Sequence, residues 1–251
     1  MANKQKIALV TGGAKRVGRA ISLGLANAGY AVAVNYNSSS ADADSLVAEI
    51  TEKGGEAIAV QADLFSPQQT RNLIPEIETA MGKLDLLINN ASVFHEDQLD
   101  SLDDELWDRH FNLHVRTPAL LTAAMASQQP DDGLIINIID ERVWKLTPNF
   151  VSYTLSKSAL WTATKTFAQA LAPNIRVNAI GPGPTLPSYR QTQDDFDRQV
   201  DTLLLKRSPQ LDEFVNTILY LANNRSITGQ MIALDGGQHL GWQTPDQLLP
   251  E

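Results

Sequence analysis

The chain has 251 residues, of which 43% are hydrophobic and 20% are charged, as in ordinary globular proteins. A chain of this length can bury a full core within one domain. Its formal net charge of −9 argues against a nucleic-acid partner, because phosphate neutralisation needs clustered Lys and Arg. The absence of cysteine excludes disulfides, thiolate catalysis and thiolate metal sites.

The N-terminal sequence MANKQKIALV contains no long apolar stretch with a cleavage site, so no signal peptide is predicted. No apolar run reaches the ~18 residues that a membrane span requires. We therefore expect a cytoplasmic protein without a membrane partner. No metal site is predicted either, since His110 and His114 lie four residues apart without an evident third ligand and fit a packed or solvated helix face better.

Short apolar segments rich in Val, Ile and Ala alternate with amphipathic segments along the chain. In chain order the pattern predicts a strand at 7–10, a helix at 16–28, a strand at 31–36, a helix at 41–53, a strand at 57–61, a helix at 67–81, a strand at 84–88, a helix at about 103–127, a strand at 134–139, a helix at 151–172, a strand at 175–180, helices at about 194–205 and 211–222, and a short strand at 231–234.

Strands that are apolar on both faces and alternate with helices form parallel sheets covered on both sides. The sequence thus predicts an α/β fold: a single-domain, Rossmann-type, doubly wound parallel sheet of about seven strands flanked by helices. We expect one domain over 1–251, with the cofactor part at roughly 1–140 and the substrate and catalytic part at roughly 140–251.

A glycine-rich loop, TGGAKRVG at 11–18, connects the first predicted strand to the first predicted helix. Glycines in this position let backbone N–H groups approach a pyrophosphate at a helix N-terminus. The alternative is a plain glycine turn, but the strand–loop–helix context favours a dinucleotide.

The second predicted strand is followed by Asn37, Ser38 and Ser39, and no acidic residue occurs before Asp42. An NAD site usually has an acidic residue here, which holds the ribose 2′-hydroxyl. Amide and hydroxyl groups can instead accept a 2′-phosphate, with positive charge from Lys15 or Arg16. This favours NADPH over NADH, although the same segment can also cap the next helix.

Tyr153 and Lys157 lie four residues apart in a predicted helix and therefore share a face. An adjacent ammonium group favours the phenolate form of a tyrosine, so we expect Lys157 to lower the pKa of Tyr153. The pair starts a long helix just after an apolar strand, where α/β sites form, although the spacing alone also arises by chance.

Together these features resemble the short-chain dehydrogenase/reductase family over nearly the whole chain. The matching residues are Thr11–Gly18, Asp63 and Leu64, Asn89–Ser92, Asn112, Tyr153 and Lys157, Gly181–Gly183, and Asp235–Gly237. The resemblance implies that Lys157 also holds the nicotinamide ribose, that Asn112 supports a proton path, and that the assembly is a homotetramer. The cofactor-binding residues that it implies are Gly12, Arg16, Val17, Gly18, Asn37, Ser38, Ser39, Asp63, Leu64, Asn90, Ala91, Ser92, Tyr153, Lys157, Gly183 and Thr185.

Two positions depart from the common pattern of this family. Arg16 stands where a third glycine is usual, and Asp140 stands thirteen residues before Tyr153, where a catalytic serine is usual. A serine binds a ketone oxygen, whereas a carboxyl group can bind an amino–imino edge or pass a proton to nitrogen. The exchange could instead reflect a lost activity.

Both departures resemble the pteridine reductases and the related dihydromonapterin and dihydrofolate reductases. In that branch the Phe94 position stacks a pterin against the nicotinamide, and the Ser92 position contacts cofactor or ligand. The resemblance implies a substrate site of Arg16, Ser92, Phe94, Asp140 and Tyr153, and a catalytic set of Asp140, Tyr153, Lys157 and Asn112.

Three functions remain open on the sequence. The first is an NADPH-dependent reductase that transfers a hydride to a small-molecule pterin or folate. The second is a short-chain carbonyl reductase that acts on a ketone or a 3-oxoacyl group. The third is a non-enzymatic NADP(H)-binding protein. The sequence does not separate the pterin substrates, and it assigns no role to Glu141, Arg142 and Trp144 or to the tail after Gly241.

Overall fold

The structure is a computed structural model and describes residues 5–242, so most of the tail lies outside the described residues. Seven strands form one parallel sheet in the order β3-β2-β1-β4-β5-β6-β7. The strands are β1 (Ile7–Val10), β2 (Ala31–Tyr36), β3 (Ala57–Gln61), β4 (Leu86–Asn89), β5 (Gly133–Ile138), β6 (Ile175–Pro182) and β7 (Met231–Leu234). The predicted doubly wound α/β fold is confirmed.

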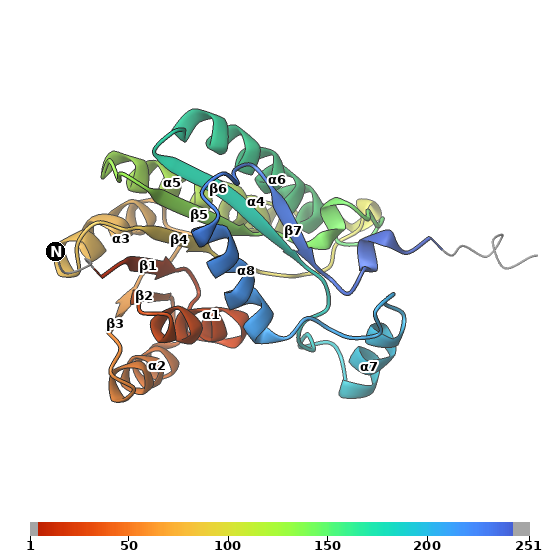
Figure 1. The fold of residues 1–251 in the computed structure, drawn as a ribbon. Coiled ribbons are helices and arrows are strands. Elements are labelled where there is room, and N and C mark those ends of the chain that lie inside the picture. The colour runs from red at the N-terminus through yellow and green to blue at the C-terminus, as the bar shows by residue number, and fades with distance from the viewer. Residues whose placement is uncertain (1–4, 243–251) are drawn as a thin grey trace, which may run out of the picture.

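Helices cover both faces of the sheet (Figure 1). One face carries α1 (Arg16–Asn27), α2 (Ser40–Glu52) and α8 (Leu211–Asn223). The other carries α3 (Pro67–Ala80), α4 (Asp104–Phe111), α5 (Thr117–Ser127) and α6 (Val151–Leu171). The short α7 (Gln193–Asp201) projects from one end of the molecule.

The central strand β1 illustrates why these segments need two helical layers. All four of its residues are buried; Ala8 and Val10 enter the core under α1, and Ile7 and Leu9 enter the core under α3 and α5. Successive residues of a strand point to opposite faces, so an all-apolar strand is stable only between two layers.

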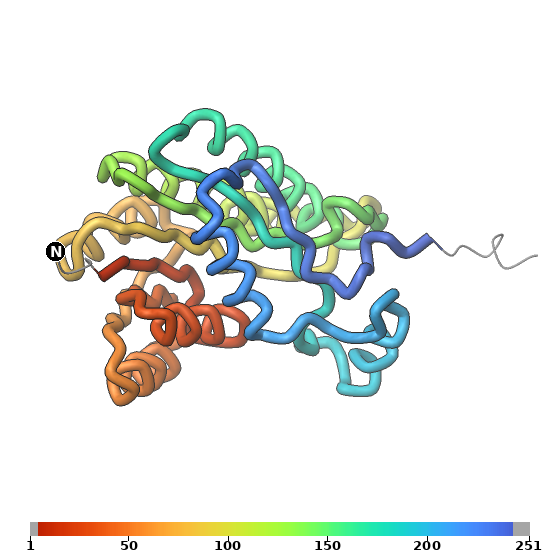
Figure 2. Tube along the Cα trace, in the orientation of Figure 1, coloured from red at the N-terminus to blue at the C-terminus, as the bar shows by residue number. Residues whose placement is uncertain are grey.

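The chain order reverses at β1. It runs outward from β1 through β2 to β3, and then returns to place β4 on the other side of β1. Figure 2 traces this path from red β1 to the orange and the yellow segments. A parallel sheet opens a crevice at the carboxyl ends of its strands at such a switch point, which places a ligand site beside β1 and β4.

Two predicted helices differ from the structure. The stretch 103–127 is continuous but contains a wide π-helical turn at Asn112–Arg116 between α4 and α5. The predicted helix at 194–205 ends at Asp201, because Leu203 is buried and the Leu205 N–H donates to the Gly236 carbonyl. The remaining strands and helices are confirmed, with ends shifted by a few residues.

None of the helices within residues 5–242 is long and apolar enough to cross a membrane.

Candidate active site

A cavity of about 340 Å³ lies at the switch point. It is lined by loops that follow β1, β2, β3 and β4, so its position is set by the sheet topology. The predicted residues that line it are Gly12, Arg16, Val17, Gly18, Asn37, Asp63, Leu64, Asn90, Ala91 and Ser92. Ser38 and Ser39 follow Asn37 in the chain but are not among the lining residues.

Glycine is required at two positions of the first loop, because neighbouring backbone atoms lie too close for a side chain. Gly12 has a φ of +58°, and a Cβ atom there would lie 3.2 Å from the Ala91 Cα. A Cβ atom on Gly18 would lie 2.3 Å from the Gly12 carbonyl oxygen. The first turn of α1 therefore packs directly against the loop, with its N-terminus towards the cavity.

Thr11 and Asn35 also shape this loop, although their roles were not predicted. The Thr11 Oγ1 accepts the N–H groups of Asn90 (2.9 Å) and Ala91 (3.0 Å), which ties the loop after β1 to the end of β4. Asn35 is buried and accepts the Gly12 N–H at 3.3 Å. The sequence signal that could have indicated these roles is a polar side chain at the carboxyl end of an otherwise apolar strand.

Arg16, at the position of the usual third glycine, has a φ of +50°, in the left-handed region. Its exposed side chain donates to the carbonyl oxygen of Pro187 at 2.9 Å. At the rim, Lys15 forms an ion pair of 2.9 Å with Asp42, and both side chains are about half exposed. Positive charge is thus available where the loop meets Asn37.

A second cavity, of about 220 Å³, adjoins the first through the shared residues Arg16 and Val17. Four further predicted residues line it, namely Phe94, Asp140, Gly183 and Thr185. Most of the predicted cofactor residues thus line the first cavity, whereas Phe94 and Asp140 line the second.

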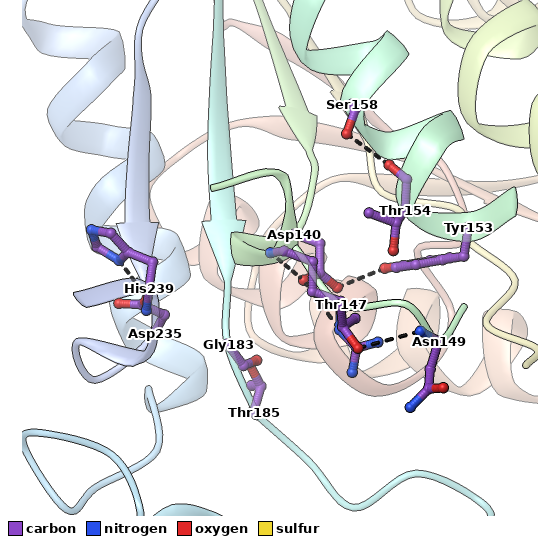
Figure 3. Close-up of polar contacts among 11 residues, drawn as sticks. Asp140, Thr147, Asn149, Tyr153, Thr154, Ser158, Gly183, Thr185, Asp235 and His239 are labelled. Carbon is purple, nitrogen blue, oxygen red and sulfur yellow. Dashed lines mark hydrogen bonds and ion pairs between the residues drawn. The ribbon is translucent and has the colours of Figure 1, made fainter. Parts of the chain in front are cut away.

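Asp140 and Tyr153 form a direct hydrogen bond at this second cavity (Figure 3). The phenol hydroxyl of Tyr153 donates to Asp140 Oδ2 at 2.8 Å, and the backbone N–H of Arg142 donates to Asp140 Oδ1 at 3.0 Å. Lys157, one turn further along α6, is buried and donates from Nζ to the Ile138 carbonyl oxygen at 3.0 Å. The three predicted catalytic side chains therefore meet at the carboxyl end of β5.

The ionisation of this group differs from the expected one. Burial and the neighbouring Asp140 hold the pKa of Tyr153 well above its ordinary value of 10.0. Burial also raises the pKa of Asp140, and burial lowers the pKa of Lys157 to about 8. The expectation that Lys157 lowers the pKa of Tyr153 is wrong for this arrangement, because burial and the hydrogen-bonded Asp140 raise that pKa. The hydroxyl is neutral and can donate a proton.

Asn112, the fourth predicted catalytic residue, is not joined to this group. It begins the wide turn, and its side-chain oxygen accepts a hydrogen bond from Arg116. Within the described residues, no hydrogen bond connects its side chain to Tyr153, Lys157 or Asp140.

His114, within the wide turn, connects the site to α6. Its Nε2 accepts the Val93 N–H at 3.3 Å and lies 3.0 Å from the Ser92 hydroxyl, while its Nδ1 lies 2.9 Å from the Ser156 hydroxyl. Burial holds its pKa well below 6.5, and the accepted N–H assigns the proton to Nδ1. Its role was not predicted; the expectation of a packed helix face is confirmed, since His110 and His114 are buried.

Phe94 belongs to an aromatic cluster. Its ring stacks on that of Phe150 with centroids 4.6 Å apart and meets the Tyr153 ring edge to face at 4.7 Å. The guanidinium groups of Arg142 and Arg190 lie 4.6–5.1 Å from the two phenylalanine rings. Phe150 and Arg190 were not predicted, because they come from loops whose positions the sequence pattern does not specify.

A metal centre has no support in the described part of the chain, where no group of three or more His, Asp or Glu side chains could hold an ion.

Comparisons with known proteins agree with this architecture. The family model described as short chain dehydrogenase matches residues 6–197. An uncharacterised oxidoreductase of Methylorubrum extorquens is 35% identical over 240 residues, covering 92% of this chain and 97% of the relative. The 3-oxoacyl-[acyl-carrier-protein] reductase FabG of Staphylococcus epidermidis is 33% identical over 244 residues, covering 94% and 99%.

A solved structure is more similar still. The FolM alternative dihydrofolate reductase 1 of Brucella canis, complexed with NADP, is 55% identical, with a TM-score of 0.94 and 96% of each chain covered. The Brucella suis protein of the same name, also in complex with NADP, is 55% identical, with a TM-score of 0.94 and coverage of 98% and 99%. With its switch-point cavity, its glycine loop and its Tyr153–Lys157 pair, the chain belongs to the short-chain dehydrogenase family.

Proposed function

We propose that this chain is an NADPH-dependent reductase of a dihydropterin, of the pterin or folate type. The observation that carries the proposal is the 2.8 Å hydrogen bond from Tyr153 to Asp140, which places a carboxyl group where a ketone reductase of this family has a serine. The 55% identity to proteins called dihydrofolate reductase, crystallised with NADP, supports the same function.

The residues present fit a dinucleotide. The cradle at Gly12 and Gly18 leaves no room for a Cβ atom, and the N-terminus of α1 faces the cavity. Lys15 and Arg16 offer positive charge to a 2′-phosphate, with Asn37 beside them and Ser38 and Ser39 next in the chain. Asp63, Leu64, Asn90 and Ala91 would line the adenine and ribose portions, and Gly183 and Thr185 the nicotinamide end.

The chain's own residues supply the proton. NADPH, when bound, supplies the hydride that reduces the carbon of a C=N bond and becomes NADP⁺. The neutral hydroxyl of Tyr153 gives its proton to the nitrogen, so that one C–H and one N–H bond form as the π bond is lost. Burial raises the pKa of Asp140, which favours the uptake of a proton from solvent, and Asp140 can pass that proton on to the phenolate. Lys157 Nζ, 5.6 Å from the centre of the tyrosine ring, offsets the transient negative charge.

Phe94 offers an aromatic wall for a flat heterocycle, beside Asp140 and Tyr153. Arg16 lines both cavities and Ser92 lines the first, so each can reach the ring. Asn112 would act through solvent, because its side chain bonds to Arg116.

The test is an assay of NADPH oxidation with dihydrobiopterin, dihydromonapterin and dihydrofolate. Turnover of at least one of them, with NADH used much less well, is the expected result. If none is reduced by a protein that binds NADPH, the proposed reaction is wrong. If no carbonyl substrate is reduced either, a non-enzymatic NADP(H)-binding protein is the better description.

A carbonyl reductase is the second candidate, favoured by the 33% identity to FabG. Asp140 argues against it, because a carboxylate repels the oxyanion that forms from a ketone. Reduction of a 3-oxoacyl thioester faster than any dihydropterin would establish this alternative.

We further propose a homotetramer in the cytoplasm, assembled through α6. Leu155 on that helix is 46% exposed, which suits a subunit contact. Size-exclusion chromatography with multi-angle light scattering would measure the molar mass of the assembly, and the mass of a monomer would contradict the proposal.

A further inference from the structure

Three residues that line the second cavity each have a buried polar atom without a hydrogen-bond partner among residues 5–242. The atoms are Oε2 of Glu141, Nη1 of Arg142 and Oε1 of Gln238. Glu141 is only 3% exposed. Leaving a polar group buried and unpaired is unfavourable, so three such atoms around one cavity indicate a polar ligand.

The three residues are held in place by the backbone around them. Glu141 and Arg142 follow Asp140 in a short 3₁₀ turn, Glu141–Val143. Gln238 belongs to the turn after β7, where the Asp235 carboxylate accepts the N–H groups of Gly237 (2.9 Å) and His239 (2.8 Å). Figure 3 shows Asp140 between Tyr153 on one side and the Asp235–His239 turn on the other. Gln238, in this turn, lines the same cavity as Asp140.

The hydrogen-bonding roles of the three atoms indicate which chemical group of a ligand could bind them. The Gln238 oxygen accepts hydrogen bonds and the Arg142 nitrogen donates them. Burial raises the pKa of Glu141 to about 8, so its carboxyl group can donate or accept near neutral pH. The acidic Asp140 and Glu141 and the basic Arg16 and Arg142 line the same cavity, so neither sign of charge dominates there. A neutral group with both a donor and an acceptor on one atom, a hydroxyl, satisfies the set.

We propose that Glu141, Arg142 and Gln238 form a subsite for the hydroxyl groups of the substituent that a dihydropterin carries next to its reacting C=N bond. The proposal rests on the proposed function, since Tyr153 and Asp140 fix the position of the reacting nitrogen. An aromatic substituent that ends in carboxylates, as in dihydrofolate, lacks these hydroxyl groups and leaves the three polar atoms without this partner.

The experiment compares two substrates that differ only in the hydroxyl groups. The ratio of kcat/KM for dihydrobiopterin to kcat/KM for its propyl analogue, whose substituent has the same three carbons and no hydroxyl group, is measured in the wild type and in variants. Glu141→Leu and Gln238→Leu should each lower this ratio about tenfold, the effect of one lost buried hydrogen bond. Glu141→Gln, the matched control, keeps the shape and both hydrogen-bonding functions and should leave the ratio within about twofold of the wild-type value.

NADPH affinity, measured by fluorescence titration, reports whether each variant is folded. An unchanged ratio in folded Gln238→Leu overturns the subsite, and so does a wild-type ratio near one. These outcomes differ from a failure of the proposed function, in which the wild type reduces neither dihydropterin. Because Gln238 lies in a separate loop from Asp140, its variant keeps the test decisive if Glu141→Leu does not fold.

Discussion

Tyr153 and Asp140, thirteen residues apart in the chain, are joined by a hydrogen bond of 2.8 Å in which the phenol is the donor. The phenol remains neutral, because burial and the adjacent carboxyl group raise its pKa. The pair therefore stores a proton at the place where a nitrogen of the substrate would receive one.

Asp140→Asn and Asp140→Ser should lower kcat/KM for dihydropterin reduction by about 100-fold or more, since positioned acids contribute roughly 10²–10⁴ to rate. The asparagine keeps the size of the side chain and removes the proton, so it separates chemistry from packing. Steady-state kinetics with saturating NADPH would measure the change. Retention of wild-type kcat in both variants would remove Asp140 from the proton path.

Glu141→Gln should change how stability depends on pH. The raised pKa, about 8, means that the folded protein binds a proton which the unfolded chain, with a pKa near 4.5, has lost. Wild-type stability therefore declines as pH rises from about 4.5 to 8, and the variant lacks this contribution. The difference in the free energy of unfolding should grow in favour of the variant, by at most about 1.4 kcal/mol per pH unit. Urea denaturation at pH 5 and pH 8 would show it, and a difference that is independent of pH would contradict the titration.

His114→Leu should destabilise the protein by about 2 kcal/mol, because the Val93 N–H and the Ser156 hydroxyl both lose a buried partner. The KM for the dihydropterin should also rise, since Ser92 loses the group that orients it. His114→Gln, which keeps one donor and one acceptor, should lose less stability. Chemical denaturation and steady-state kinetics would measure both effects, and equal stability of the leucine variant and the wild type would show that the network contributes little.

Arg16→Gly should be more stable than Arg16→Ala by about 1 kcal/mol, because the φ of +50° is strained for alanine and free for glycine. Both variants should bind substrate and NADPH more weakly than the wild type, since both lose the guanidinium group. Thermal unfolding measures the difference in stability between the two variants, and kcat/KM compares each variant with the wild type. Identical melting temperatures for the two variants would show that the loop relaxes to a different conformation.

Lys15→Ala should raise the Kd for NADPH about tenfold and leave the Kd for NADH nearly unchanged, because only the first cofactor has a 2′-phosphate. Asp42→Asn, which frees Lys15 from its ion pair, serves as the opposite control and should tighten NADPH binding. Fluorescence titration at low salt would measure both. Equal effects of Lys15→Ala on the two cofactors would place the phosphate elsewhere.

Much of the fold could be predicted because the strands are apolar on both faces and each helix is amphipathic. β1, β2, β3 and β7 match the predicted residues. The grouping of Arg16, Phe94 and Asp140 around one cavity also follows from loops at the carboxyl edge of a parallel sheet.

The rest depends on geometry that a linear pattern does not contain. The direction of the Tyr153 pKa shift required knowing that Asp140, and not only Lys157, lies against the phenol. The bonds of His114 to Ser92 and Ser156 required a non-α-helical turn, which periodicity cannot detect. The unpartnered atom of Gln238 became evident only with the cavity that it shares with Glu141.

The wide turn at Asn112–Arg116 changes the rotation of the helix about its axis, so that the side chains before and after the turn face different neighbours. Before the turn, His110 faces Ser152 of α6; after it, the Thr117 hydroxyl reaches the Leu64 carbonyl oxygen at 2.7 Å. One residue advances an α-helix by about 100°, so deleting any residue of the turn would rotate one half against the other by that angle. The number of residues between His110 and Thr117 should therefore vary less among related proteins than the residue types at these positions. An alignment gap in this turn would mark a protein with a different active site.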